Sequence, residues 1–275
     1  MKFVFFGSPR FAEIILEKLI AGNCAPSLVV TNPDRPFGRK KILTPPPVKV
    51  VAEKHTIQVV QPESLKNYKF PSTAYDFAVV AAYSKILPQA VIDLPRLGII
   101  GVHPSLLPKY RGASPIQSAL LHGEKETGVT LYKMDAAIDH GPMIARETLA
   151  IETNDTYETT LEKLANISGN LLLKMIPRFL NSELGFKEQD HDRATLTKKF
   201  SSEDGFVDPS LLHEAENVGG ASAQKVFNMI RALNPEPGVW TMKDGKRMKL
   251  LKAHIEHGRL RVDSFQMEGK KPTRS

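Results

Sequence analysis

The chain has 275 residues, of which 41% are hydrophobic and 24% are charged. This is the composition of an ordinary globular protein with two domains or one large one. No apolar run approaches the roughly 18 residues that a membrane helix needs, and residues 1–9 are expected to begin a sheet rather than to form a signal peptide. The single cysteine, Cys24, excludes an internal disulfide and any metal site built from several cysteines, and it fits a cytoplasmic location.

The formal net charge is +7, and most of it lies in two segments. Residues 240–275 contain ten basic and four acidic side chains, and a second basic cluster occupies residues 35–49. Two separated basic segments favour a polyanionic partner such as a nucleic acid, although a merely solvated basic face has the same composition.

The first elements along the chain follow the order strand, turn, helix. Residues 2–6 are an apolar run, residues 7–9 break it, and residues 11–19 carry apolar side chains at helical spacing. The turn lacks the G-x-G-x-x-G dinucleotide pattern, and the chain has no G-x-x-x-x-G-K-[ST] loop. A nicotinamide cofactor and a P-loop nucleotide site are therefore not supported.

A strand at residues 27–31 leads into a long loop at residues 32–47, which has five prolines and four basic residues. That many prolines exclude a helix and favour extended or turn backbone. Long loops are often functional, and a basic arm suits a phosphate backbone. The alternative is a disordered excursion without a role.

Strands and helices alternate from there to residue 180. The expected helices are residues 48–54, 63–67, 89–93, 114–122 and 156–180, and the expected strands are residues 57–60, 76–82, 99–102, 128–134 and 143–151. This alternation predicts an α/β fold with a Rossmann-like, mainly parallel sheet and helices on both faces. Because ligands bind beyond the carboxyl ends of parallel strands, we expect the loops 83–88, 103–112 and 135–142 to share one edge and one cleft.

We expect a catalytic domain at residues 1–184, a polar linker at residues 185–204 and a small C-terminal β domain at residues 205–275. The last should contain a helix at 221–233 and strands at 239–242, 248–255 and 260–265. Turns at Asp244-Gly245 and His257-Gly258 separate these strands.

His103 directly follows an apolar strand, and Asp139 lies in a later strand-end loop. An isolated histidine is more often structural, but a polar side chain at the end of a buried strand needs a reason. A nearby carboxylate would orient the imidazole and favour its charged form. No G-x-S-x-G or H-E-x-x-H motif is present, so a serine hydrolase and a zinc site are not expected. The two residues predict a general acid–base site.

Several motifs resemble those of the folate-dependent formyltransferases. The central ones are His103-Pro104-Ser105-Leu106-Leu107-Pro108, Lys109-Tyr110-Arg111-Gly112 and Asp135-x-x-x-Asp139-x-Gly141. Others resemble the branch that formylates methionyl-tRNA: Pro33-Asp34-Arg35-Pro36-x-Gly38-Arg39, Pro47-Val48-Lys49, Glu203-Asp204-Gly205 and Ile230-Arg231-Ala232-Leu233-Asn234-Pro235-x-Pro237-Gly238. The resemblance spans nearly the whole chain.

The resemblance implies transfer of a formyl group from 10-formyltetrahydrofolate to the α-amine of initiator methionyl-tRNA. It implies that His103 and Asp139 are the catalytic pair, and that a shortened OB-like C-terminal domain grips the tRNA. The implied folate contacts are Ser105, Leu106, Leu107, Pro108, Leu87 and Ile138, and the implied tRNA contacts are Arg39, Lys40 and Lys41. We expect no metal, no membrane association and a monomer.

The chain departs from the family pattern at Gly101, where the family usually has an asparagine two residues before the histidine. Glycine cannot donate to the formyl oxygen, so either another donor or water replaces the amide, or turnover falls. On this reasoning, asparagine at position 101 should raise the turnover rate. The C-terminal domain is also shorter than the family barrel, which leaves more of the tRNA grip to residues 34–49 and the basic tail.

Two other functions stay open. An enzyme of the same class could formylate an amino-sugar nucleotide; the central motifs permit this, but the Arg39 loop and the motif at residues 230–238 argue against it. Alternatively, the chain could bind folate or tRNA with impaired catalysis because of Gly101. Formyl transfer to charged initiator tRNA, compared with a UDP-amino-sugar, separates the three functions.

Overall fold

The computed structural model describes residues 1–38, 40–72 and 74–274 of the chain. Two compact units are present, and the chain passes between them several times. The first consists of Met1–Arg111, Gly128–Leu149 and Glu162–Thr195, and the second consists of Gly112–Thr127, Ala150–Leu161 and Leu196–Ser275. The expected domain limits at residues 184 and 205 stay a prediction.

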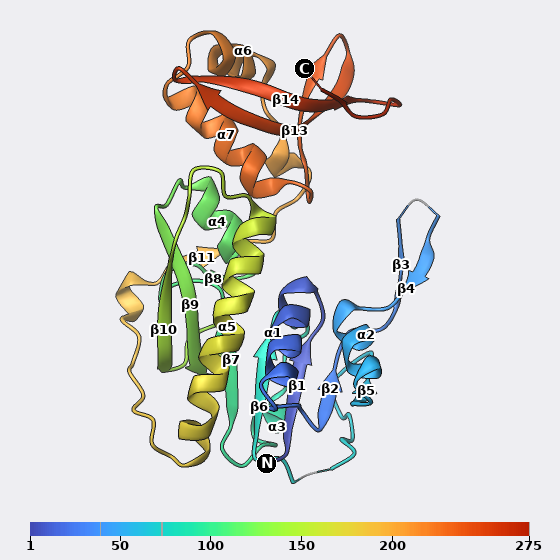
Figure 1. Cartoon of the computed structure of the whole chain (residues 1–275), viewed down its shortest axis with the longest axis vertical. Coiled ribbons are helices and arrows are strands. Elements are labelled where there is room, and N and C mark those ends of the chain that lie inside the picture. Colours follow the sequence, from blue (N-terminus) through green and yellow to red (C-terminus); the bar gives the residue numbers. More distant parts are fainter. Residues whose placement is uncertain (39, 73, 275) are drawn as a thin grey trace. The chain divides into compact units, whose positions relative to one another are not determined.

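A seven-stranded sheet organises the first unit (Figure 1). In spatial order its strands are β10 (Met143–Ala150), β9 (Glu126–Lys133), β7 (Ile99–His103), β6 (Phe77–Ala81), β1 (Phe3–Gly7), β2 (Leu28–Val30) and β5 (Gln58–Val60). The pairs β1–β2, β1–β6, β2–β5 and β6–β7 are parallel, whereas β9 runs antiparallel to β7. The prediction of a mainly parallel α/β sheet is confirmed.

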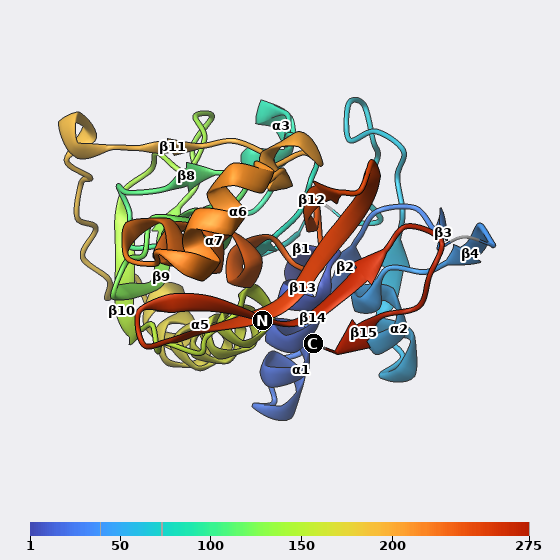
Figure 2. The same ribbon diagram turned by 90° about the horizontal axis from the view of Figure 1, so that it is seen from above.

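Helices cover both faces of this sheet, so its central strands are buried and almost entirely apolar. All five residues of β1 and of β7 are buried, as expected for strands without a solvent face. The helices α1 (Arg10–Ala21) and α5 (Tyr157–Leu180) lie on one face, and α3 (Gln89–Ile92) lies on the other (Figures 1 and 2). A further helix, α2 (Pro47–Lys54), packs beside β2 and β5.

Two segments differ from expectation. Residues 63–67 are not a helix. The Lys85 ammonium donates hydrogen bonds to the carbonyl oxygens of Pro62 and Glu63, at 2.5 and 2.9 Å. A helix of so few residues would gain little from its own hydrogen bonds. The proline-rich loop contains a hairpin of β3 (Arg35–Phe37) and β4 (Ile42–Thr44). Its strands have the extended backbone that proline favours.

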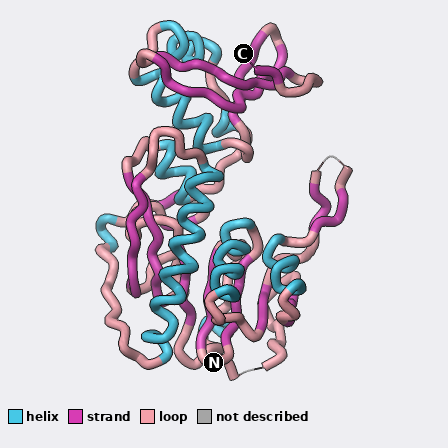
Figure 3. Tube along the Cα trace, viewed as in Figure 1, coloured by secondary structure: helices cyan, strands magenta, loops and turns pink. Residues whose placement is uncertain are grey.

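Within the described residues, the second unit contains three helices and a four-stranded antiparallel sheet (Figure 3). The helices are α4 (Pro115–Leu121), α6 (Pro209–Asn217) and α7 (Ala221–Leu233), and the strands are β12 (Val239–Lys243), β13 (Lys246–Glu256), β14 (Arg259–Met267) and β15 (Thr273–Arg274). The order β12-β13-β14-β15 leaves β12 and β15 as edges, so the part of this unit that the structure describes forms an open sheet and not a closed barrel. The predicted small β domain is confirmed, while α6 was not anticipated.

Both expected turns of this sheet are present. At Asp244-Gly245 and at His257-Gly258 both residues have positive φ, between 49° and 76°, which is the backbone of a type I′ hairpin turn. A shorter ladder pairs β8 (Arg111–Gly112) with β11 (Leu196–Thr197), and single 3₁₀ turns occur at His191–Arg193 and Glu203–Gly205. Within the described ranges, no helix combines the length and apolar character of a membrane span.

Candidate active site

The last residue of β7, His103, is buried between a carbonyl and a carboxylate. Its Nε2 lies 2.8 Å from the carbonyl oxygen of Tyr110, and its Nδ1 lies 3.4 Å from Oδ2 of Asp139. A carbonyl oxygen only accepts hydrogen bonds, so Nε2 must carry a proton. Nδ1, which faces the carboxylate, is therefore the ring nitrogen that is available for proton transfer.

Hydrogen bonds from other parts of the first unit hold Asp139 and its loop. The Tyr132 hydroxyl donates to Oδ1 of Asp139 at 2.7 Å, and Gln189 Nε2 donates to the carbonyl oxygens of Asp139 and Gly141 at 2.9 and 2.8 Å. Asp139 has a φ of +48°, a conformation that aspartate tolerates better than most residues. The carboxylate is thus presented by a loop whose backbone is fixed.

The expectation that three loops share one edge of the sheet is wrong for residues 135–142. Strand β9 is antiparallel to β7, with Lys133 opposite Ile100, so this loop leaves the sheet near the beginning of β7. It reaches His103 because it folds back over the sheet. The loops 83–88 and 103–112 do share an edge, since β6 and β7 are parallel.

The site includes two polar residues to which sequence reasoning assigned no role: Arg111, which belongs to one of the central motifs, and Gln189, which belongs to none. Gln189 Oε1 accepts hydrogen bonds from Nε and Nη2 of Arg111 at 3.2 and 2.7 Å, and both side chains are buried. Arg111 Nη2 also lies 2.9 Å from Nδ1 of His191, whose ring stacks on His140 at 4.1 Å. Residues 187–191 therefore brace the Asp139 loop, although their polar composition suggested only a linker.

The space beside Gly101 is filled by Tyr132, which stands directly opposite it on β9. A Cβ at position 101 would lie 2.4 Å from Cε1 and Cζ of Tyr132 and 2.8 Å from its hydroxyl oxygen. Real Cβ atoms do not approach other atoms so closely. The expectation that asparagine at this position raises turnover is therefore corrected, because its side chain has no room while Tyr132 is present.

The residues predicted to contact folate fall into two groups. Ser105, Leu107 and Leu87 are buried, and the Leu107 N–H and carbonyl bond to Thr130 Oγ1 and Arg146. Leu106 and Pro108 are partly exposed. Ile138 is 69% exposed, and Ile86, which the prediction omitted, is 91% exposed. The contacts themselves stay a prediction.

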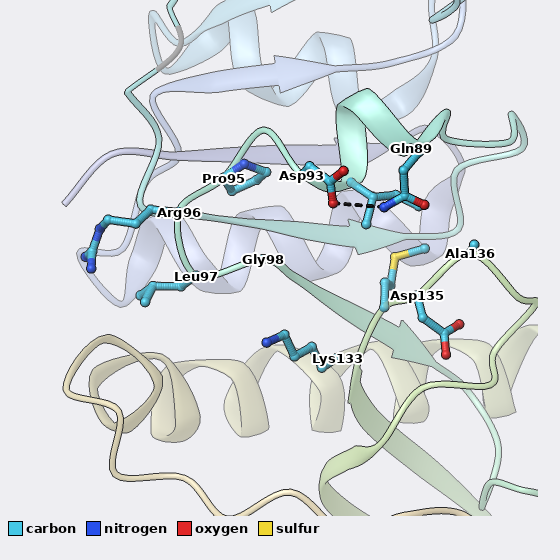
Figure 4. A pocket seen from close by; sticks show the side chains of 11 residues that line it. Gln89, Asp93, Pro95, Arg96, Leu97, Gly98, Lys133, Asp135 and Ala136 are labelled. Atoms are coloured by element: carbon cyan, nitrogen blue, oxygen red, sulfur yellow. Dashed lines mark hydrogen bonds between the residues drawn. The ribbon is translucent and has the colours of Figure 1, made fainter.

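A pocket of about 470 Å³ lies behind the Asp139 loop (Figure 4). Figure 4 shows Gln89 and Asp93 on one side of it and Lys133, Asp135 and Ala136 on the other. Asp135 and Ala136 of the predicted 135–142 loop line it, but none of the residues predicted to be catalytic or to contact folate or tRNA does. It is a neighbour of the site and not its centre.

Of the residues predicted to contact tRNA, Arg39 lies outside the described residues. Lys40 and Lys41 are exposed at the turn of the β3–β4 hairpin, which extends beyond α2 in Figure 1. The hairpin base is anchored because Lys49 Nζ and Gln61 Nε2 both bond to Asp34, at 2.9 and 2.7 Å. These contacts lower the pKa of Asp34, with Lys49 as the main cause.

No group of three or more histidine, cysteine, aspartate or glutamate residues in the described part of the chain could hold a metal ion. The polar groups that the site does offer are the imidazole, the carboxylate and their hydrogen-bond partners.

Comparisons with known proteins agree with this arrangement. The model of the family "Formyl transferase" matches residues 1–176, and that of "Formyl transferase, C-terminal domain" matches residues 220–269. The methionyl-tRNA formyltransferase of Kosmotoga olearia is 42% identical over 93% of this chain and 80% of its own length. The corresponding enzyme of Staphylococcus epidermidis is 41% identical over 94% of this chain and 81% of its own length.

A solved structure of similar fold is the N-formyltransferase of Helicobacter canadensis in complex with folinic acid and dTDP-3-aminofucose. Its TM-score is 0.66 at 20% identity, over 98% of this chain and 96% of that chain. The family match over most of the chain, and the relatives at about 40% identity, lead to one conclusion: the chain belongs to the formyl transferase family, in the branch of the methionyl-tRNA formyltransferases.

Proposed function

We propose that this chain transfers a formyl group from 10-formyltetrahydrofolate to the α-amine of initiator methionyl-tRNA, in the cytoplasm and as a monomer. The observation that carries the proposal is the His103–Asp139 pair, with Nδ1 3.4 Å from Oδ2, in a chain about 40% identical to methionyl-tRNA formyltransferases. The identity extends through both units, which favours the same acceptor.

The chemistry needs a place for a proton and a way to stabilise a negative oxygen. The amine nitrogen bonds to the formyl carbon, the formyl oxygen takes on negative charge, and the attacking amine loses a proton. The bond from the formyl carbon to the folate nitrogen then breaks, and the folate nitrogen takes up a proton as it leaves. In this proposal His103 Nδ1 takes up that proton, and Asp139 stabilises the resulting imidazolium. The Tyr110 carbonyl keeps the other ring nitrogen protonated, so the ring stays in one orientation.

The residues available for folate binding suit a flat, partly apolar ring. The exposed side chains of Ile86 and Ile138 follow β6 and β9 respectively, and exposed apolar groups of this size commonly mark binding surfaces. We propose that they contact the pterin, together with the predicted residues Ser105, Leu106, Leu107, Pro108 and Leu87.

The β3–β4 hairpin is the proposed arm for the tRNA. Lys40 and Lys41 lie at its turn and are exposed, and Arg39 directly precedes them in the sequence. Lysine and arginine at such a position contact phosphates without reading sequence. The salt bridge from Lys49 to Asp34, at 2.9 Å, would hold the arm in place when it binds.

The second candidate function is formylation of an amino-sugar nucleotide, which the ligand of the Helicobacter canadensis structure motivates. That likeness is at 20% identity and concerns the fold. The test is to incubate the protein with 10-formyltetrahydrofolate and either charged initiator tRNA or a nucleotide-linked amino sugar. We expect formylation of the tRNA alone; formylation of the sugar alone would establish the second function, and no transfer to either would refute both.

A further inference from the structure

We propose that Tyr132 is a positioning residue of the active site: its hydroxyl holds one oxygen of Asp139 so that the other faces His103, and Gly101 provides the room for its ring. This inference rests on the proposed function. It concerns a residue to which no motif assigned a role, and it explains why a glycine stands beside the catalytic histidine.

The fit between Gly101 and Tyr132 is tight and specific. The two residues are a cross-strand pair of β7 and β9, and such pairs are the closest side-chain neighbours in a sheet. The aromatic ring covers the glycine, an arrangement that compensates for the missing side chain. The ring is buried and packs with Leu107, Met143 and Met134, so its hydroxyl has a fixed place.

The two oxygens of Asp139 have different partners. Oδ1 accepts from Tyr132 at 2.7 Å, and Oδ2 lies 3.4 Å from His103 Nδ1. A hydrogen bond to Oδ1 fixes the plane of the carboxylate, so Oδ2 stays turned towards the imidazole. The aspartate can therefore meet the imidazolium as a correctly turned partner.

The tyrosine stays a donor throughout the working range of pH. Burial raises its pKa well above the usual value, and the negative charges of Asp139 and Asp135 add to this effect. Further ionisable groups near Asp139 include His103 on β7, and Asp135 and His140 in the same loop, which bond to each other at 2.7 Å. Beside them, Tyr132 offers Asp139 a neutral donor.

The test compares Tyr132→Phe with Tyr75→Phe, which removes the hydroxyl of another buried tyrosine of the first unit, in the core beside β1, β2 and β6. For Tyr132→Phe we expect kcat for methionyl-tRNA formylation to fall about ten- to a hundredfold, the usual effect of one hydrogen bond to a charged group. The KM for 10-formyltetrahydrofolate and the KM for tRNA should each stay within about twofold of wild type, because the hydroxyl bonds to Asp139 and not to a substrate. Tyr75→Phe should change neither kcat nor the two KM values.

A second measurement does not depend on activity. In a double-mutant cycle of stability, Tyr132→Phe combined with Asp139→Ala should lose clearly less than the sum of the two single losses, because both changes remove the same hydrogen bond. The losses of Tyr75→Phe and Asp139→Ala should simply add. A kcat within twofold of wild type would overturn the inference, and so would stability losses of Tyr132→Phe and Asp139→Ala that simply add. A wild type that formylates no tRNA would refute the proposed function, and the stability measurement would still decide the role of Tyr132.

Discussion

Replacement of Gly101 by alanine perturbs the site while leaving every polar group in place. The added Cβ would stand 2.4 Å from Cε1 and Cζ of Tyr132, whereas carbon atoms in contact are about 3.5–4.0 Å apart. The ring must therefore move by roughly 1 Å inside a packed cluster, and such overpacking costs about 1–3 kcal/mol. Since 1 kcal/mol corresponds to about 2–4 °C for a unit of this size, we expect Tm to fall by about 2–12 °C.

The assay is thermal unfolding followed by circular dichroism, with kcat for formyl transfer measured on the same preparations. Gly185→Ala is the matched control, because a Cβ there meets nothing within 4 Å. Gly101→Ala combined with Tyr132→Leu should lose less stability than the sum of the two single losses, since the smaller side chain leaves room for the added Cβ. The reasoning fails if Gly101→Ala is as mild as Gly185→Ala, or if Tyr132→Leu relieves nothing. For the same reason, Gly101→Asn alone should lower both Tm and turnover.

Three further predictions follow from other interactions. Gln189→Glu keeps the acceptor for Arg111 but removes the donor to the Asp139 and Gly141 carbonyls, so kcat should fall about tenfold; unchanged kcat would remove residues 187–191 from the site. We expect a higher KM for tRNA, and an unchanged KM for folate, in each of the variants Arg39→Ala, Lys40→Ala and Lys41→Ala. Each basic side chain removed from a phosphate should also reduce the log–log slope of tRNA affinity against salt by about 0.7–0.9. Equal losses for both substrates would mean that the hairpin supports the fold. The hydrogen bond from Lys198, followed by those from Ser201, lowers the pKa of Asp204 to about 2 from a usual 3.8. The stability that Asp204 contributes is therefore present above about pH 4 and lost towards pH 2. Asp204→Asn should lower the free energy of unfolding by about 1 kcal/mol at pH 7, after allowance for solvent screening. A loss of the same size in acid would count against the ion pair.

The apolar runs of the chain predicted most of the first unit. Strands such as β1 and β7 are buried on both faces, so each appears as an unbroken hydrophobic segment. The direction of β9 could not be read in this way, because a strand has the same pattern whichever way it runs. The expectation of one shared loop edge failed for that reason, although His103 and Asp139 do lie together.

The residues that support the site were harder to predict. Gln189 lies in a polar segment, and only its hydrogen bonds distinguish it from a solvated side chain. Tyr132 has the position and hydrophobic character of an ordinary strand residue, so its hydroxyl gave no signal. Gly101 was recognised as a departure from the family pattern, but the structural reason for a glycine there is its cross-strand neighbour Tyr132, which lies 31 residues later in the sequence. In each case an interaction distant in sequence supplies the function.

The most direct test of the account is the rate of formyl transfer to charged initiator tRNA by the wild type and by His103→Ala, with folate binding measured on both. We expect the wild type to formylate the tRNA. The variant should lose about a hundred- to ten-thousandfold in kcat, the usual contribution of a general acid–base group, and should bind folate as well as the wild type does. A variant that transfers formyl at the wild-type rate would contradict the role assigned to His103 and Asp139.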